Sequence, residues 1–342
     1  MARPISLAAA IALSLSSTPL IAEPIKPIPQ ESGFSGSLVV GLSATEYSSN
    51  MIAGPNGDLA DSNIDSLDDK PGSESDVSPF FTGELNYTFS KSRTQLFLGS
   101  ALEDLVRYDL TFQAGVRQEL ADKSIVYGAY LFSAIPTEVY ADPYQTGSSR
   151  DETDRASSGA RIGWQGIMGS GFGVELTHRS IELDDEDSGD ALVAQGAITA
   201  AQQDDLSREG DLNAITISYR HSIAQGQFLV PEINYRDYDL DGEAMAKSQY
   251  GGSLAYFYNT PQYSLITTVF YSHFEHDEEN PIYGITEEGD SFGGSIVGTY
   301  HNLFGWEGFS GLATVGYAES DSDINFYDAD VVTGSLGVLY RF

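Results

Sequence analysis

The residues best suited to nucleophilic chemistry are His178, one of five histidines, and Ser180 two positions later. Residues two apart on a β-strand share a face, so an imidazole base can lie beside a hydroxyl nucleophile at this spacing. The same face carries Phe172, Val174 and Leu176 and is therefore apolar. The sequence shows no third group that would orient the histidine, and an interfacial polar role is the alternative. We expect no enzymatic activity, with a lipid hydrolase that uses His178 and Ser180 as the reading to test.

A second candidate site is a calcium loop. Asp237, Asp239, Asp241 and Gly242 reproduce the D-x-D-x-D-G opening of such a loop. The twelfth position, where a bidentate glutamate closes the coordination shell, is Ser248. We expect no metal or other cofactor here, with Ca²⁺ on these three aspartates as the alternative to an acidic hairpin turn.

Charged and amide side chains also recur at alternate positions of otherwise apolar segments. In residues 108–118, Asp109 and Arg117 alternate with Leu110 and Val116. Because charge at every second position is costly on a lipid-facing surface, these side chains are predicted to face a barrel interior. Such a mixed-sign lining is either a selectivity device or a network of ion pairs that supports the wall. The predicted lumen-lining residues are Asp109, Gln113, Arg117, Arg161, Gln165, Glu175, Arg179 and Arg220.

The elements that must position these residues are β-strands long enough to cross a membrane. The last one alternates apolar Val332 and Tyr340 with polar Thr333 and Arg341, and it ends on Phe342. This pattern is typical of bacterial outer-membrane barrels, and it makes Tyr340 and Phe342 the predicted assembly signal for a barrel-assembly machinery. We predict an all-β protein, a single antiparallel up-and-down transmembrane barrel of about fourteen strands; twelve or sixteen would follow if one hairpin is misread. The segments are 34–47, 79–90, 94–102, 108–118, 124–134, 157–166, 172–182, 212–222, 227–239, 248–259, 263–275, 290–300, 309–319 and 330–342.

One predicted strand contains a proline. Pro231 has no N–H to donate to a ladder. We therefore expect a bulge or kink at this position that exchanges the inward and outward faces of residues 227–239.

The composition agrees with a barrel. A net charge of −33 and a mean hydropathy of −0.20 are values expected of a soluble protein. Barrel strands also average to moderate hydropathy, however, because lipid-facing and lumen-facing residues alternate. Acidic residues gather in predicted long outer connections, for example in 48–78 and 183–211, whereas the short connections and both termini belong on the periplasmic side. This charge excludes nucleic acid as a partner and favours a surface that attracts cations.

The first residues have the features of an export signal. Arg3 precedes an apolar core from Ile5 to Leu15, and small residues lead to a cleavage site after Ala22. The predicted organisation is a signal peptide at 1–22, a proline-rich periplasmic lead-in at 23–33 and the outer-membrane barrel at 34–342.

Three further segments carry a family resemblance. Residues 31–36 after the proline-rich lead, 49–54, and 84–89 running into 93–99 are similar to a Gram-negative outer-membrane β-barrel family of unknown function. The resemblance implies an outer-membrane barrel and brings no substrate. The His178-x-Ser180 spacing also resembles outer-membrane phospholipases, except that Ile181 and Glu182 replace the Asn-Gly that follows the serine in that family.

These observations predict a porin-like channel for passive diffusion of small hydrophilic solutes, with a preference for cations. Fourteen strands imply a lumen of roughly 10–15 Å, which is open unless a long loop folds into it. The alternative is a non-conducting surface protein whose acidic loops bind divalent cations, lipopolysaccharide or other cells. The third reading is the lipid-modifying enzyme. The expected location is the outer membrane of a Gram-negative bacterium, with its lipid and lipopolysaccharide as partners.

Overall fold

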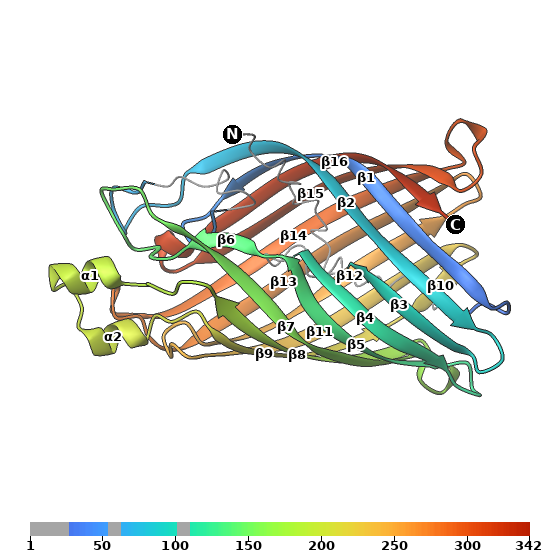
Figure 1. Ribbon diagram of the computed structural model, residues 1–342, viewed down its shortest axis with the longest axis horizontal. Coiled ribbons are helices and arrows are strands. Elements are labelled where there is room, and N and C mark those ends of the chain that lie inside the picture. The colour runs from blue at the N-terminus through green and yellow to red at the C-terminus, as the bar shows by residue number, and fades with distance from the viewer. Residues whose placement is uncertain (1–26, 54–62, 101–109) are drawn as a thin grey trace, which may run out of the picture.

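The computed structural model describes residues 27–53, 63–100 and 110–342, which form one closed antiparallel β-barrel (Figure 1). Two pairs of labelled strands share one neighbour: β5 and β6 both pair with β7, and β9 and β10 both pair with β11. Counting each pair as one wall strand gives fourteen, which confirms the predicted barrel. The strands are β1 Gly33–Ser48, β2 Ser73–Phe89, β3 Thr94–Ser100, β4 Leu110–Glu119, β5 Ile125–Ile135, β6 Thr137–Tyr140, β7 Glu152–Gln165, β8 Phe172–Leu183, β9 Gly210–Tyr219, β10 His221–Ala224, β11 Gln227–Leu240, β12 Lys247–Asn259, β13 Tyr263–Glu279, β14 Thr286–His301, β15 Phe309–Ser322 and β16 Ala329–Arg341.

The barrel closes between its first and last strands. β16 pairs with β1 from Ser37 opposite Arg341 to Ser48 opposite Asp330. Beyond the ladder, the backbone N–H of Gly36 donates to the Phe342 carbonyl at 3.0 Å, and the Phe342 N–H donates to the Gly36 carbonyl at 3.1 Å. The final residue therefore contributes main-chain hydrogen bonds to the seam, which leaves no open sheet edge there.

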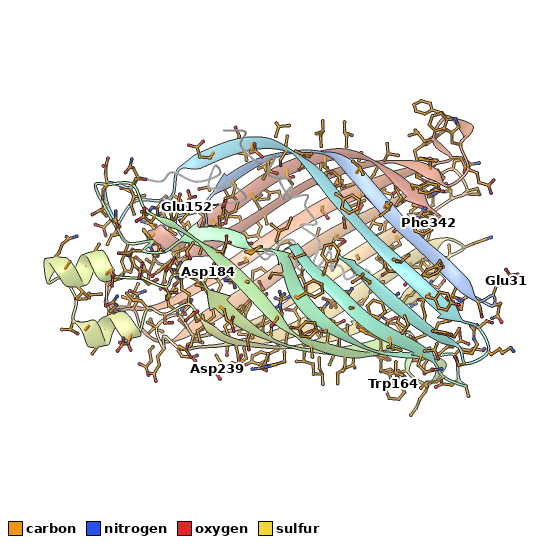
Figure 2. All side chains as sticks on the ribbon, in the orientation of Figure 1. Glu31, Glu152, Trp164, Asp184, Asp239 and Phe342 are labelled. Carbon is orange, nitrogen blue, oxygen red and sulfur yellow. The ribbon has the colours of Figure 1, made fainter. Side chains whose placement is uncertain are left out.

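Side chains alternate between an apolar outer surface and a polar interior, as a membrane barrel requires. Ile162 and Leu336 on the outside are 57% and 70% exposed, whereas Arg161 and Ser335 beside them are 5% and 6% exposed. Figure 2 shows the side chains that project outward along the whole wall. The protein is thus an outer-membrane β-barrel. Among the described residues, no helix has the length and apolar character needed to cross a bilayer.

The predicted exchange of faces at Pro231 is wrong. β11 keeps one continuous register with β12 from Gln227 to Tyr238, and exposed Pro231 lies between buried Val230 and buried Glu232. The irregularity falls on the neighbouring strand, where Ile223 of β10 is an extra residue in the pairing with β11. Because the proline lacks only a donor, the ladder loses a hydrogen bond while the alternation of β11 is unchanged.

The two ends of the barrel differ. Short turns and Phe342 lie at the periplasmic end, with Glu31 and Trp164, whereas Glu152 and Asp184 mark the outer end (Figure 2). The β8–β9 loop at the outer end carries the short helices α1 (Asp190–Gln195) and α2 (Ala200–Asp204). The predicted signal peptide at 1–22 lies outside the described residues.

Candidate functional site

The inner wall holds a buried ion pair that joins β7 and β8. Arg161 Nε lies 3.2 Å from Glu175 Oε1 and donates to Thr177 Oγ1 at 2.9 Å. The hydroxyl of Tyr127, on β5, donates to the other oxygen of Glu175. Both charges are largely withdrawn from water, so each is stabilised by the other. Removing either one would leave its partner buried without a counter-charge.

Gly163 makes room for this arrangement. It lies opposite Tyr127 on one side and Glu175 on the other, and a Cβ at Gly163 would come within 2.3 Å of the Tyr127 ring. A side chain here would displace the ring from Glu175.

We therefore expect Gly163→Val to destabilise the barrel by about 1–3 kcal/mol. The measurement is the temperature at which the refolded protein loses its compact mobility in detergent gels. Gly128→Val is the matched control, since the nearest atom to a Cβ at Gly128 is 3.9 Å away. Equal melting of the two variants would contradict this packing argument.

Two other predicted lumen residues are also tied to the wall. Arg117 on β4 lies 3.0 Å from Glu84 and stacks 3.9 Å over the ring of Phe97. Arg179 on β8 is buried and donates to Thr111 at 2.9 Å and to Ser157. Both arginines are therefore held in contacts between strands, and a role in lining a lumen stays a prediction.

The remaining predicted lining residues have varied positions. Gln113 is buried on β4, and Gln165 is half-buried near the periplasmic end of β7. Arg220 lies between β9 and β10 and places its guanidinium carbon 3.8 Å over the ring of Phe228. Asp109 lies outside the described residues. The part that each plays in solute passage stays a prediction.

Loops from opposite sides of the barrel meet above its outer mouth. The β6–β7 loop (141–151) and the β15–β16 loop (323–328) are separated by six wall strands in one direction around the ring and eight in the other. The hydroxyls of Tyr144 and Tyr327 nevertheless lie 2.7 Å apart, and the rings of Tyr144 and Phe326 stack at 5.5 Å. This contact spans the mouth.

These loops share one apolar core, which we call the outer cap. Phe326 and Tyr144 are fully buried at its centre, together with Leu206 from the β8–β9 loop. Met245 from the β11–β12 loop and Ile282 from the β13–β14 loop pack against the same cluster. Burial raises the pKa of the Tyr144 and Tyr327 hydroxyls, so both stay protonated at neutral pH. A core built from loops that would otherwise be solvated makes the cap a single packed unit.

Buried polar groups hold the cap to the barrel rim. Arg150 donates to the Asn50 carbonyl at 2.8 Å and stacks 3.6 Å over Tyr140. The carboxylate of Asp142 accepts from the backbone N–H groups of Tyr144, Gly189 and Ala191 at 3.0, 3.0 and 2.9 Å. These contacts join the β1–β2, β6–β7 and β8–β9 loops.

A buried acid and a buried imidazole face each other beneath the cap. His276 Nε2 lies 3.4 Å from Glu287 Oε2, while His276 Nδ1 is 2.9 Å from the Ala244 carbonyl. Because that carbonyl can only accept, Nδ1 carries a proton and the neutral ring points its lone pair at Glu287. Burial lowers the pKa of His276 to about 3 and raises the pKa of Glu287 to about 7. Below about pH 7 the pair is therefore a neutral acid beside a neutral imidazole.

This pair lies outside the membrane-spanning part of the wall. On β13 and β14 the outward-facing aromatic residues nearest the outer end of the membrane are Tyr271 and Phe292, which lie opposite each other. His276 is five residues beyond Tyr271 toward the outer end of β13.

The candidate nucleophile and base are not joined to each other. His178 Nδ1 lies 2.9 Å from Asn213 Oδ1 on β9, whereas Ser180 Oγ donates to Asp211 Oδ1 at 2.6 Å. Sequence analysis missed Asn213 because its place beside His178 depends on the register between β8 and β9. The structure thus supplies an orienting group for the histidine while directing the serine elsewhere.

The three aspartates of the calcium motif do not converge. Asp237 and Asp239 lie on the outward face of β11, while Asp241 follows in the loop. Within residues 27–53, 63–100 and 110–342, no cluster of three or more histidine and acidic side chains is arranged to hold a metal ion. The expectation of no metal here stays untested, as does its Ca²⁺ alternative.

The described end of the proline-rich lead-in is fixed at the periplasmic end. Ile28 is buried, and Arg93 donates to its carbonyl and to that of Pro29, the latter at 2.7 Å. Arg93 also pairs with Glu119 at the end of β4, and this guanidinium lowers the pKa of Glu119 to about 2. Arg93, in the turn between β2 and β3, therefore fixes the chain just before β1.

Comparisons with solved structures return outer-membrane proteins of low sequence identity. The CymD monoaromatic hydrocarbon channel is 9% identical, with 97% of this chain and 94% of that chain covered and a TM-score of 0.49. The outer membrane channel DcaP of Acinetobacter baumannii is 9% identical, with 91% and 98% covered and a TM-score of 0.43. A Pseudomonas aeruginosa FadL homologue is 10% identical, with 90% of each chain covered and a TM-score of 0.42. A search of curated proteins gave no match.

A family model covers the whole barrel, from the first residue of β1 to the last residue of β16. The chain belongs to the family described as "Protein of unknown function (DUF2860)", whose model matches residues 33–341.

Proposed function

We propose that this protein is a diffusion channel for small hydrophilic solutes whose outer cap opens and closes the mouth. The observation that carries the proposal is the character of the inner wall. Ion pairs such as Arg161 with Glu175 and Arg117 with Glu84 line a wall whose outer surface is apolar. A barrel of this strand number is too wide for side chains alone to fill, so its interior holds water.

A preference for cations follows from the charge at the outer end. Burial raises the pKa of Asp187, and the neighbouring Asp190 and Asp185 add to the effect. Desolvation and then Asp237 and Asp239 raise the pKa of Asp277 in the same way. Carboxylates that raise one another's pKa create a negative potential, which concentrates cations at the mouth.

Planar-bilayer recording of the refolded protein tests this function. We expect rare openings of the capped protein and, in a salt gradient, a reversal potential displaced toward the equilibrium potential of the cation. A reversal potential displaced toward that of the anion would overturn the selectivity while leaving the channel intact.

A second function is favoured by the packing of the cap itself. Contacts that span the mouth, such as Tyr144 with Tyr327, are expected in a non-conducting surface protein whose outer loops form a fixed binding surface. One result distinguishes the two functions. If neither the wild type nor a variant with a disrupted cap carries current, the channel is rejected and the surface-protein function is retained.

A further inference from the structure

The outer wall has a groove of about 540 Å³ across β7, β8, β9 and β11. One row of its lining, on the side nearer the periplasmic end, consists of side chains that lie opposite each other on adjacent strands. In strand order these are Ile162, Leu176, Ile215 and Tyr235. These side chains are between 37% and 57% exposed on the lipid-facing surface. The row is suited to an acyl chain, because apolar contact is what this surface offers.

The next row toward the outer end changes character. Ala160, His178, Asn213 and Asp237 lie opposite one another in the same strand order. Ala160, whose side chain is small, is among the residues that line the groove. The change from apolar to polar between these rows marks the level at which lipid tails give way to head groups.

The polar row offers both donors and acceptors. His178 Nδ1 and Asn213 Oδ1 are 2.9 Å apart, which leaves the His178 Nε2 lone pair and the Asn213 amide N–H groups for a ligand. Asp237 adds a carboxylate that only accepts. Sugar hydroxyls, which both donate and accept, match this set, whereas an anionic phosphate beside Asp237 is disfavoured by repulsion.

We propose that this groove binds the glycolipid of the outer leaflet, with an acyl chain on the Ile162 row and sugar hydroxyls on the His178 row. The groove is on the outside of the wall, so this site is independent of conduction. It also gives the His178–Asn213 contact a role that does not need Ser180, whose hydroxyl is held by Asp211 at 2.6 Å.

The test is native mass spectrometry of full-length barrel extracted from outer membranes, which counts retained lipopolysaccharide and phospholipid per molecule. Ala160→Trp fills the groove and is expected to lower retained lipopolysaccharide about tenfold. Ala44→Trp is the control, because Ala44 is also outward-facing and lies between exposed Leu42 and Glu46 on β1, away from the groove.

A second pair of variants decides the matter if the tryptophan variants fail to fold. His178→Ala is expected to reduce retained lipopolysaccharide, and His273→Ala is not, although His273 is likewise near the outer end and lies 2.9 Å from Asp290. Equal retention within both pairs of variants overturns the proposal. Retention of phospholipid in place of lipopolysaccharide overturns the glycolipid assignment as well.

Discussion

Replacing Phe326 with alanine is expected to turn a mostly closed barrel into one that conducts for much of the recording time. Phe326 is fully buried at the centre of the outer cap, where its ring contacts Tyr144, Tyr283 and Tyr327. Truncation of a buried phenylalanine to alanine costs about 3–5 kcal/mol. If that cost falls on the closed cap alone, the ratio of closed to open states drops by about two orders of magnitude or more.

The measurement is open probability in planar bilayers, recorded from the wild type and the variant in the same salt. Phe304→Ala is the control, because Phe304 lies in an exposed turn at the periplasmic end and is 80% exposed. The Phe326 variant must keep its compact mobility in detergent gels, which shows that the wall is folded. Unchanged open probability in a folded variant would show that the cap does not block the mouth.

The second large effect concerns the buried acid beneath the cap. The pKa of Glu287 is raised to about 7, mainly by burial, so the closed cap keeps a proton that an opened cap releases above about pH 4.5. The stabilisation from this group is complete below pH 4.5 and is lost as the pH rises through 7. His276, whose pKa is lowered to about 3, has the opposite dependence: its stabilisation is complete above pH 6.5 and is lost as the pH falls toward 3. The wild-type cap is therefore most stable between about pH 4.5 and 6.5.

Glu287→Gln is expected to close the barrel more firmly at pH 8 and to have little effect at pH 5. A glutamine reproduces the neutral acid, because its amide donates to His276 Nε2 and its carbonyl accepts from Ser322 Oγ, which lies 2.8 Å from Glu287 Oε1. It avoids the cost of a buried carboxylate, on the order of 3 kcal/mol at pH 8 with the attraction of Lys247 already included. The open probability at pH 8 should accordingly fall by about ten- to a hundredfold.

Glu288→Gln is the matched control, since Glu288 is adjacent and exposed. Hydrogen exchange of residues 280–285 gives a readout that does not depend on current, and it should slow in the Glu287 variant at pH 8 only. A Glu287→Gln variant that behaves alike at both pH values would show that the carboxyl group is already charged inside the closed cap.

Sequence patterns were reliable for the wall because each strand is constrained by the same local requirement. The alternation in residues 110–118 and the aromatic end at Tyr340 and Phe342 follow from lipid on one side and water on the other, and both can be found strand by strand. The exchange of faces expected at Pro231 was wrong for a related reason: a missing donor is a local defect, whereas strand register is set by both neighbours together.

Contacts between distant loops had no comparable signal. Tyr144 and Phe326 lie in segments that sequence patterns mark only as long outer connections, and nothing local pairs them. The Asn213 partner of His178 and the Glu84 partner of Arg117 likewise depend on how neighbouring strands are aligned. Aromatic residues in otherwise acidic loops are the one feature that hints at a shared core, since a solvated loop gains nothing from them.

The sequence by itself determined that this chain builds a membrane barrel, because the alternation of apolar and polar residues is imposed on every strand by its two solvents. Only the tertiary structure decided that loops from opposite sides meet above the outer mouth, that Arg117, Arg161 and Arg179 are tied into the wall, and that polar side chains border a lipid-facing groove. These features arise where residues remote in sequence are brought together by barrel closure and strand register, and no local pattern records which of them will meet.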